Sequence, residues 1–144
     1  MASINKRPDL SVILKQKDIS PTKQRLIIAD VIFEQHQHLT ADQVLDAVKI
    51  RDASVSRATV YNTLNLFSTK NLVRELVIDK SKVVYDSNVE PHHHIYNVDT
   101  GELTDLGAQG ISVSGLPEMP SGLRVEGADV VIRVRQTLDK KLAS

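Results

Sequence analysis

Apolar residues recur every three or four positions through the first half of the chain, which is the spacing of one face of an α-helix. Polar and turn-forming residues interrupt this pattern, so we expect separate helices within residues 8–18, 20–35, 38–52 and 53–73. The positions expected to face a core are Leu10, Ile13, Leu14, Leu26, Ala29, Ile32, Phe33, Val44, Leu45, Val48, Val60, Leu64 and Phe67.

Residue types support three of the expected helix ends. Thr40 is followed by Gln43 three positions on, which is the signature of a capping box. Ser56 is an expected N-cap for the last helix, and Asn71 can take the left-handed conformation that ends a helix. The short polar link at 52–54 joins the two helices, so we expect a helix-turn-helix.

After Asn71 the pattern changes to alternation of apolar and polar residues, which is typical of strands. The segments "LVRELVI" and "KVVYDS" flank the short turn "DKS", so a β-hairpin should follow the last helix, as in a winged helix. The stretch "SNVEP" then breaks the pattern and is the expected domain boundary.

The second half is expected to be mostly β-structure. "HHIYNV" and "ELTDL" flank "DTG" as a second hairpin, and "LRVEGADVVIRVRQTL" alternates with Val130, Ile132 and Val134 on one face. Between them, "GAQGISVSGLPEMPSG" is rich in Gly and Pro and should be mostly loop. A sheet this small buries little core by itself, so we expect it to pair with a second copy in a homodimer.

The pattern therefore predicts an α+β protein with two domains. We expect a winged helix-turn-helix domain over residues 1–86, a hinge over 87–91, and a small, mostly β dimerisation and sensing domain over 92–144.

Composition narrows the class of protein. The chain has 144 residues, of which 41% are hydrophobic and 25% charged, as in soluble globular proteins. It has no apolar run of the ~18 residues needed to cross a bilayer and no apolar signal segment, so we expect a cytoplasmic protein without membrane contact. The absence of cysteine excludes disulfides, thiolate zinc sites and cysteine ligation of haem.

The net charge is zero, but the two halves differ in sign. Residues 1–88 contain 13 Lys and Arg against 10 Asp and Glu, which gives +3, and residues 89–144 contain 5 against 8, which gives −3. A mildly basic first half is compatible with a nucleic-acid partner.

The helix beginning near Ser56 has a polar but almost uncharged outer face, which suits base reading better than phosphate binding. Asn pairs with adenine, whereas Thr methyls and Tyr rings contact the thymine methyl. An ordinary packed helix with a polar outer face is the alternative. The candidate DNA-reading residues are Arg57, Thr59, Tyr61, Asn62 and Thr63, with phosphate contacts expected from Lys23, Arg25, Arg57 and Lys70.

Three consecutive histidines carry the candidate metal chemistry. Side chains alternate along a strand, so His92 and His94 should face one side and His93 the other, with Asp105 within reach on the next strand. Nitrogen and oxygen ligands without sulfur suit Mn²⁺, Fe²⁺ or Zn²⁺. A metal site, a haem site and a plain polar strand all remain compatible with this tract. His38, before the capping box, and Asp86, at the end of the first hairpin, are further possible ligands.

The segments "PTKQRLIIADVIFEQHQHLTADQVLDAV", "SRATVYNTLNLFSTKNLV" and "HHHIYNVDTGELTDL" resemble the ferric uptake regulator (Fur) family over residues 19–134. The cysteine-free "HHHIYN" and the shortened "LPEMPSGLRVEGADVVIRVR" most resemble its iron response regulator (Irr) branch of alphaproteobacteria. The resemblance implies a winged-helix domain, an α/β dimerisation domain and a homodimer on an AT-rich inverted repeat in double-stranded DNA.

The resemblance also implies specific site residues. A regulatory metal between the domains would be held by His38, Asp86, His92, His94 and Asp105. Tyr61 would contact bases and Arg25 would contact DNA. His92, His93 and His94 fall on the haem-binding motif of the Irr branch.

Two metal sites of the wider family are expected to be missing. Asn97 and Thr100 stand where most members carry a CxxC pair, so no structural zinc held by four cysteines is expected. A further metal site of the family uses an acidic residue that follows the position of Asp105 and a histidine later in the chain. Ser112 and Ala128 stand at those two positions here.

Together these features predict a metal- and haem-responsive transcriptional regulator of iron homeostasis, not an enzyme. We expect a metal to fix the spacing of the recognition helices and haem to weaken DNA binding. One alternative is a haem-binding carrier without specific DNA binding. The other is a metal-dependent hydrolase, which the sequence disfavours because no carboxylate or histidine remains for a catalytic role.

Overall fold

The computed structural model describes residues 9–34, 38–90, 92–107 and 110–137. The chain divides into two compact units, the first ending at Val89 and the second beginning at Glu90. The first unit combines helices with a small sheet, and the second is built on strands, which confirms the predicted α+β class.

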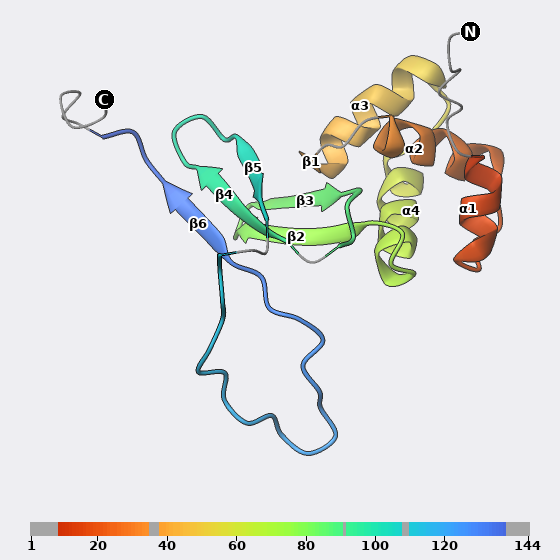
Figure 1. The fold of residues 1–144 in the computed structure, drawn as a ribbon. Coiled ribbons are helices and arrows are strands. Elements are labelled where there is room, and N and C mark those ends of the chain that lie inside the picture. Colours follow the sequence, from red (N-terminus) through yellow and green to blue (C-terminus); the bar gives the residue numbers. More distant parts are fainter. Residues whose placement is uncertain (1–8, 35–37, 91, 108–109, 138–144) are drawn as a thin grey trace, which may run out of the picture. The chain divides into compact units, whose positions relative to one another are not determined.

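The described part of the first unit contains four helices beside its small sheet (Figure 1). Each begins after a residue whose side-chain oxygen accepts a hydrogen bond from a backbone N–H of the first turn. Such a cap satisfies one of the free N–H groups at a helix start. The helices, each with its N-cap, are α1 Leu10–Gln16 after Asp9, α2 Lys23–Phe33 after Thr22, α3 Ala41–Arg51 after Thr40, and α4 Arg57–Thr69 after Ser56.

The predicted capping box of α3 is confirmed. Thr40 Oγ1 accepts from the Gln43 N–H at 3.2 Å, and Gln43 Oε1 accepts from the Thr40 N–H at 2.9 Å. Asn71 follows α4 with a φ of 58°, so its predicted left-handed conformation is also confirmed.

An aliphatic core lies between the helices. Its central side chains, including Leu14, Val48, Leu64 and Phe67, have no exposed surface. The predicted inner faces of α3 and α4 are confirmed. The predicted face of α2 is confirmed but incomplete, because this helix is apolar on more than one side. It buries Ile28, Ala29, Val31 and Ile32, whereas Leu26 and Phe33 are only half-buried.

The predicted wing hairpin is present, as strands β2 (Arg74–Asp79) and β3 (Lys82–Asp86). A third strand, β1 (His38–Leu39), pairs antiparallel with β3. The sheet of the first unit therefore has the strand order β1-β3-β2. His38 lies before the capping box, as expected, but the strand it belongs to was not predicted. Two residues are too few to show alternation, so this strand leaves no recognisable pattern in the sequence.

The second unit contains a three-stranded sheet with the order β5-β4-β6. Strand β4 (His93–Asn97) pairs antiparallel with β5 (Leu103–Leu106), as predicted for the second hairpin. It also pairs in parallel with β6 (Val131–Val134). Of the sixteen residues predicted to alternate, 123–137 lie in the described part of the chain; they pair with β4 over Val131–Val134, and Val130 lies outside the strand.

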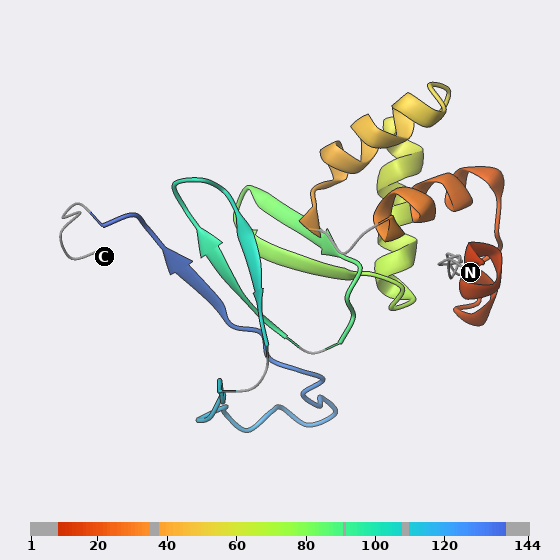
Figure 2. The ribbon, with the colours of Figure 1, turned by 45° about the horizontal axis from the view of Figure 1, so that its top comes forward.

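A long connection leads from β5 to β6 and extends away from the sheet (Figure 2). Its described residues, 107 and 110–130, form no helix or strand. This agrees with the predicted loop as far as residue 122, whereas residues 123–130 were predicted to alternate as a strand. Apolar side chains remain exposed in this unit, including Leu123 (64%), Ile132 (40%) and Val134 (37%). The small sheet therefore leaves apolar surface in contact with water.

Among the described residues, no helix combines the length and apolar character needed to cross a membrane.

Candidate functional site

His92, His94 and Asp105 form a compact cluster in the second unit. Asp105 lies directly opposite His94 in the β4–β5 pairing. Its Oδ1 is 3.2 Å from Nε2 of His94 and 3.2 Å from Nε2 of His92. The two imidazole rings are 4.4 Å apart between centroids. Alternation along the strand thus brings the side chains at positions 92 and 94 to the same carboxylate.

The third histidine makes a different contact. The backbone N–H of Val130 donates to Nδ1 of His93 at 3.0 Å, and the N–H of His94 donates to the Val130 carbonyl at 3.0 Å. His93 thus joins β4 to the chain that enters β6. Because Nδ1 accepts this bond, the proton of the neutral ring is on Nε2.

The cluster fits a divalent transition metal. The possible ligand atoms of His92, His94 and Asp105 lie within 4.8 Å of one another. Nδ1 of His92 lies 2.6 Å from the Glu90 carbonyl oxygen and can donate its proton there, which leaves the Nε2 lone pair directed at the cluster. Such a bond on the far ring nitrogen is the usual way in which proteins orient a metal-binding histidine. Two nitrogens and one carboxylate match the preferences of Mn²⁺, Fe²⁺ and Zn²⁺.

The two other predicted ligands pair with each other in the first unit. His38 lies opposite Asp86 in the β1–β3 pairing, and its Nε2 is 3.0 Å from Asp86 Oδ2. Asp86 Oδ1 accepts from the N–H of Asn88 at 2.9 Å. The unexpected strand β1 is therefore what brings these two side chains together.

The predicted DNA-reading face lies on α4. Arg57, Tyr61 and Asn62 are exposed, and Thr59 is half-exposed. The prediction that Thr63 is exposed is wrong, because its side chain is only 6% exposed. Thr63 lies on the edge of the stripe that α4 buries with Leu64 and Phe67, a boundary that helical periodicity alone does not fix.

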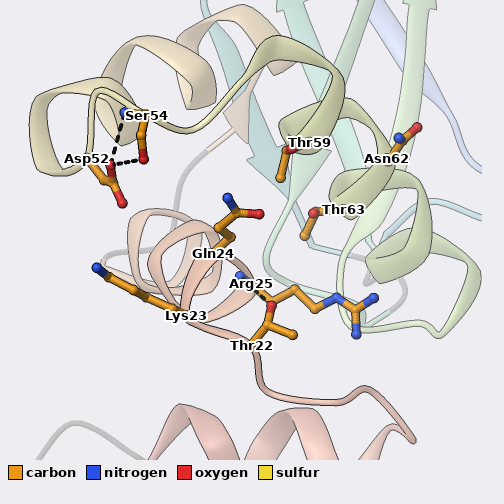
Figure 3. Close-up of a pocket in the computed structure, with 9 residues that line it drawn as sticks. All are labelled: Thr22, Lys23, Gln24, Arg25, Asp52, Ser54, Thr59, Asn62 and Thr63. Carbon is orange, nitrogen blue, oxygen red and sulfur yellow. Dashed lines mark hydrogen bonds between the residues drawn. The ribbon is translucent and has the colours of Figure 1, made fainter.

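A groove of about 620 Å³ separates the start of α2 from α4. Gln24 of α2 faces the same space as Thr59 and Thr63 of α4 (Figure 3). Two cations, Lys23 and Arg25, line it from the first turn of α2, where the backbone N–H groups also favour anions. Arg25 donates to the Ser20 carbonyl at 3.0 Å, which holds its guanidinium near this turn. Cations and hydroxyls on two adjacent helices suit contact with a phosphate backbone.

The sequence did not reveal Asp42 as part of this surface. Its Oδ1 accepts from Nη1 of Arg57 at 2.5 Å and from the hydroxyl of Tyr61 at 3.1 Å. The guanidinium of Arg57 also lies 5.9 Å from the centre of the Tyr61 ring. The hydrogen bonds from Arg57 and Tyr61 lower the pKa of Asp42, and the hydrogen bond to Asp42 raises the pKa of Arg57. Only the packing of α3 against α4 brings these residues together.

A family profile described as the ferric uptake regulator family matches residues 16–119. The peroxide-responsive repressor PerR of Staphylococcus aureus strain Mu50 is 34% identical over 93 residues, or 65% of this chain. The match spans 63% of that relative, just under two thirds of its length.

Solved structures resemble most of the chain. The ferric uptake regulator from Pseudomonas aeruginosa with manganese has a TM-score of 0.65 at 24% identity, over 88% of this chain and 96% of that one. The Campylobacter jejuni peroxide stress regulator has a TM-score of 0.62 at 24% identity, over 90% and 98%. At these identities the likeness establishes the fold.

The contact between Asp42 and Arg57 predicts a pH dependence. The pKa of Asp42 is lowered from 3.8, so the pairing should stabilise the folded state above that pH and be lost as the pH falls through the folded-state pKa. We expect the carboxyl carbon of Asp42, followed by NMR, to titrate below 3.8 in the wild type. In Arg57→Gln its midpoint should rise. An unchanged midpoint would show that Arg57 does not pair with Asp42 in solution.

Proposed function

The chain belongs to the ferric uptake regulator family, and on that premise we propose that it is a metal-responsive transcriptional regulator that binds double-stranded DNA as a homodimer. The observation that carries the proposal is the placement of His92 and His94 around Asp105, a ligand cluster in the same chain as a winged helix-turn-helix. On this proposal the protein acts in the cytoplasm and is not an enzyme.

We propose that α4 reads bases while the start of α2 binds the backbone. Asn62 offers a paired donor and acceptor for adenine, and Tyr61 offers an aromatic ring for thymine methyls, which together favour AT-rich sites. Lys23 and Arg25 supply positive charge for phosphates. Thr59 and Arg57 complete the exposed face, and Thr63 supports it from the edge of the core.

One metal ion is proposed to bind all five ligands: His38, Asp86, His92, His94 and Asp105. Support comes from the two ligand clusters, one in each unit, and from the family resemblance. An ion held by residues of both units would restrict the predicted hinge over 87–91, of which residue 91 lies outside the described residues. A divalent Lewis acid held in this way would bind more tightly to one orientation of the two domains than to others. This difference in metal affinity would change the affinity of the protein for DNA.

A homodimer would set a defined spacing between the two recognition helices. Half-sites read by a dimer lie about 34 Å apart or at multiples of that distance, so the operator should be an inverted repeat. The exposed Ile132 and Val134 on β6, at the edge of the sheet, support pairing with a second copy because such surface is costly to leave in water.

We further propose a haem response, as in the Irr branch, and a role in iron homeostasis. The cysteine-free chain and its three adjacent imidazoles support this assignment. Haem iron would take its ligands from His92, His93 and His94. A histidine bound to haem would not be available to the regulatory metal ion. In this scheme the regulator acts as a repressor or activator when iron is scarce, and haem releases it from DNA.

His94→Ala should weaken Mn²⁺ binding by more than about 10-fold, since even residues that only orient a metal ligand are worth about 10–100-fold. Isothermal titration or the EPR signal of free Mn²⁺ measures this. His93→Asn is the matched control, because its amide oxygen can still accept from the Val130 N–H. Equal Mn²⁺ affinity in wild type and His94→Ala would refute the assigned site.

The DNA contacts should separate into two kinds. A site is first selected by the metal-loaded protein from a pool of randomised duplexes. Asn62→Ala should cost about 1–3 kcal/mol on that site and little on a scrambled one. Lys23→Gln should weaken both duplexes alike and reduce the slope of log affinity against log salt by about 0.9. Fluorescence anisotropy at several salt concentrations measures both effects.

If the pool yields no preferred sequence with or without metal, the regulator proposal fails. If Asn62→Ala weakens both duplexes equally, α4 does not read bases through this residue.

Haem should reduce affinity for the selected site in the wild type. The variant with His92, His93 and His94 all changed to Ala should lose both the haem Soret band and this response. A triple variant that retains a normal haem response would exclude these histidines as the haem ligands. Haem binding by a wild type that forms no specific DNA complex would instead favour the haem-carrier alternative.

A further inference from the structure

Asp42 holds two side chains of the proposed DNA-reading face at once. Arg57 and Tyr61 are four positions apart on α4 and therefore lie on the same side of the helix. Both donate to one oxygen of Asp42, at 2.5 Å and 3.1 Å. Asp42 is in the first turn of α3, so this contact crosses between the two helices of the helix-turn-helix.

The contact restrains Tyr61 without covering it. Its hydroxyl is bound to Asp42, yet the side chain is 42% exposed. A ring fixed at its polar end presents its apolar edge in one orientation, and it loses little conformational freedom when it meets a thymine methyl.

The same contact changes what Arg57 can do. A free arginine on a DNA-binding surface binds any phosphate, whatever the sequence. Here the guanidinium is paired with a carboxylate, so the pair carries no net charge. Arg57 thus adds little to sequence-independent affinity while the pair persists.

The surroundings of Asp42 also disfavour phosphate. Asp42 and Tyr61 line a hollow of about 340 Å³ that reaches the wing hairpin, and Glu75 and Tyr85 of that hairpin line it too. Two carboxylates on one small hollow repel an anion, so a phosphate gains little by replacing Asp42 as the partner of Arg57.

We infer that Asp42 is a specificity-determining positioning residue, which orients Tyr61 for base contact and withholds Arg57 from non-specific phosphate contacts. The inference rests on the proposed DNA-binding function and concerns how α4 distinguishes its site from other DNA. Asp42 sets the ratio of specific to non-specific affinity through Tyr61 and Arg57 and makes no DNA contact itself.

The test is Asp42→Asn in the full-length, metal-loaded protein. Asp46→Asn is the matched control, because it removes the same charge from an exposed position on the same helix. Each protein is titrated by anisotropy against the selected site and a scrambled duplex over a range of salt. Thermal unfolding is measured alongside to show that each variant is folded. The midpoint should change little, because the exposed pair of Asp42 and Arg57 contributes little to folding stability.

We expect Asp42→Asn to bind scrambled DNA about 5- to 10-fold more tightly near ~0.1 M salt, because Arg57 gains a phosphate contact. The salt slope on that duplex should become steeper by about 0.9. The ratio of specific to non-specific affinity should fall by up to about 10-fold, since the Tyr61 hydroxyl exchanges its bond to a carboxylate for a weaker bond to a neutral amide oxygen and is held less firmly. Adding Arg57→Gln to Asp42→Asn should restore the wild-type salt slope.

Three results would overturn the inference. The first is a ratio and slope in Asp42→Asn equal to those of Asp46→Asn, while the wild type binds its site specifically. The second is a steeper slope that persists when Arg57→Gln is added. The third is a wild type without specific binding, which overturns the proposed function together with this inference; the first two leave that function intact.

Discussion

The pairing of β4 with β5 is the interaction on which the proposed sensing site depends. It sets Asp105 opposite His94, and the two-residue period of the strand adds His92 to the same side. A shift of one residue in this register would move the carboxylate away from both imidazoles. His93, which the same period turns elsewhere, accepts from Val130 and ties β4 to the entry of β6. The ligand geometry and the sheet are therefore set by the same backbone pairing.

In the first unit, too, a few neighbouring residues serve several roles. The capping box fixes the start of α3, and two residues after Thr40 stands Asp42, which holds Arg57 and Tyr61 of α4. Strand β1, directly before Thr40, sets His38 opposite Asp86. Thus one short segment, from His38 to Asp42, carries a proposed metal ligand, a helix cap and the contact to the recognition helix. A change in this segment affects both proposed functions of the unit.

Much of this could be predicted from the sequence because local rules decide it. The caps at Thr40 and Ser56, the turn at Asn71 and both hairpins follow from residue types within a few positions. The side-by-side placement of His92 and His94 follows from strand geometry. Contacts between elements could not be predicted in this way. Strand β1 is too short to leave a pattern, and Asp42 resembles any acidic residue in a first helical turn until α3 packs against α4.

The differences between prediction and structure have the same origin. Helical periodicity locates the core but not its edge, so it wrongly predicts an exposed Thr63 and misses part of the buried face of α2. Near β6 the alternation of apolar and polar residues continues well beyond the four paired residues. The pattern therefore predicts a longer strand than forms, because a strand also needs a partner to pair with. The sequence thus determines which elements form, and tertiary packing determines which of their outer residues remain exposed.

Metal binding and DNA binding are coupled in the proposed regulator, and thermodynamic linkage tests this coupling directly. The measurement is the affinity for Mn²⁺ by isothermal titration, with and without a saturating amount of the selected DNA site. Coupling predicts that DNA raises the affinity for Mn²⁺ by the same factor by which Mn²⁺ raises the affinity for DNA. Equal Mn²⁺ affinities in the two titrations would mean that the histidine cluster does not control DNA binding.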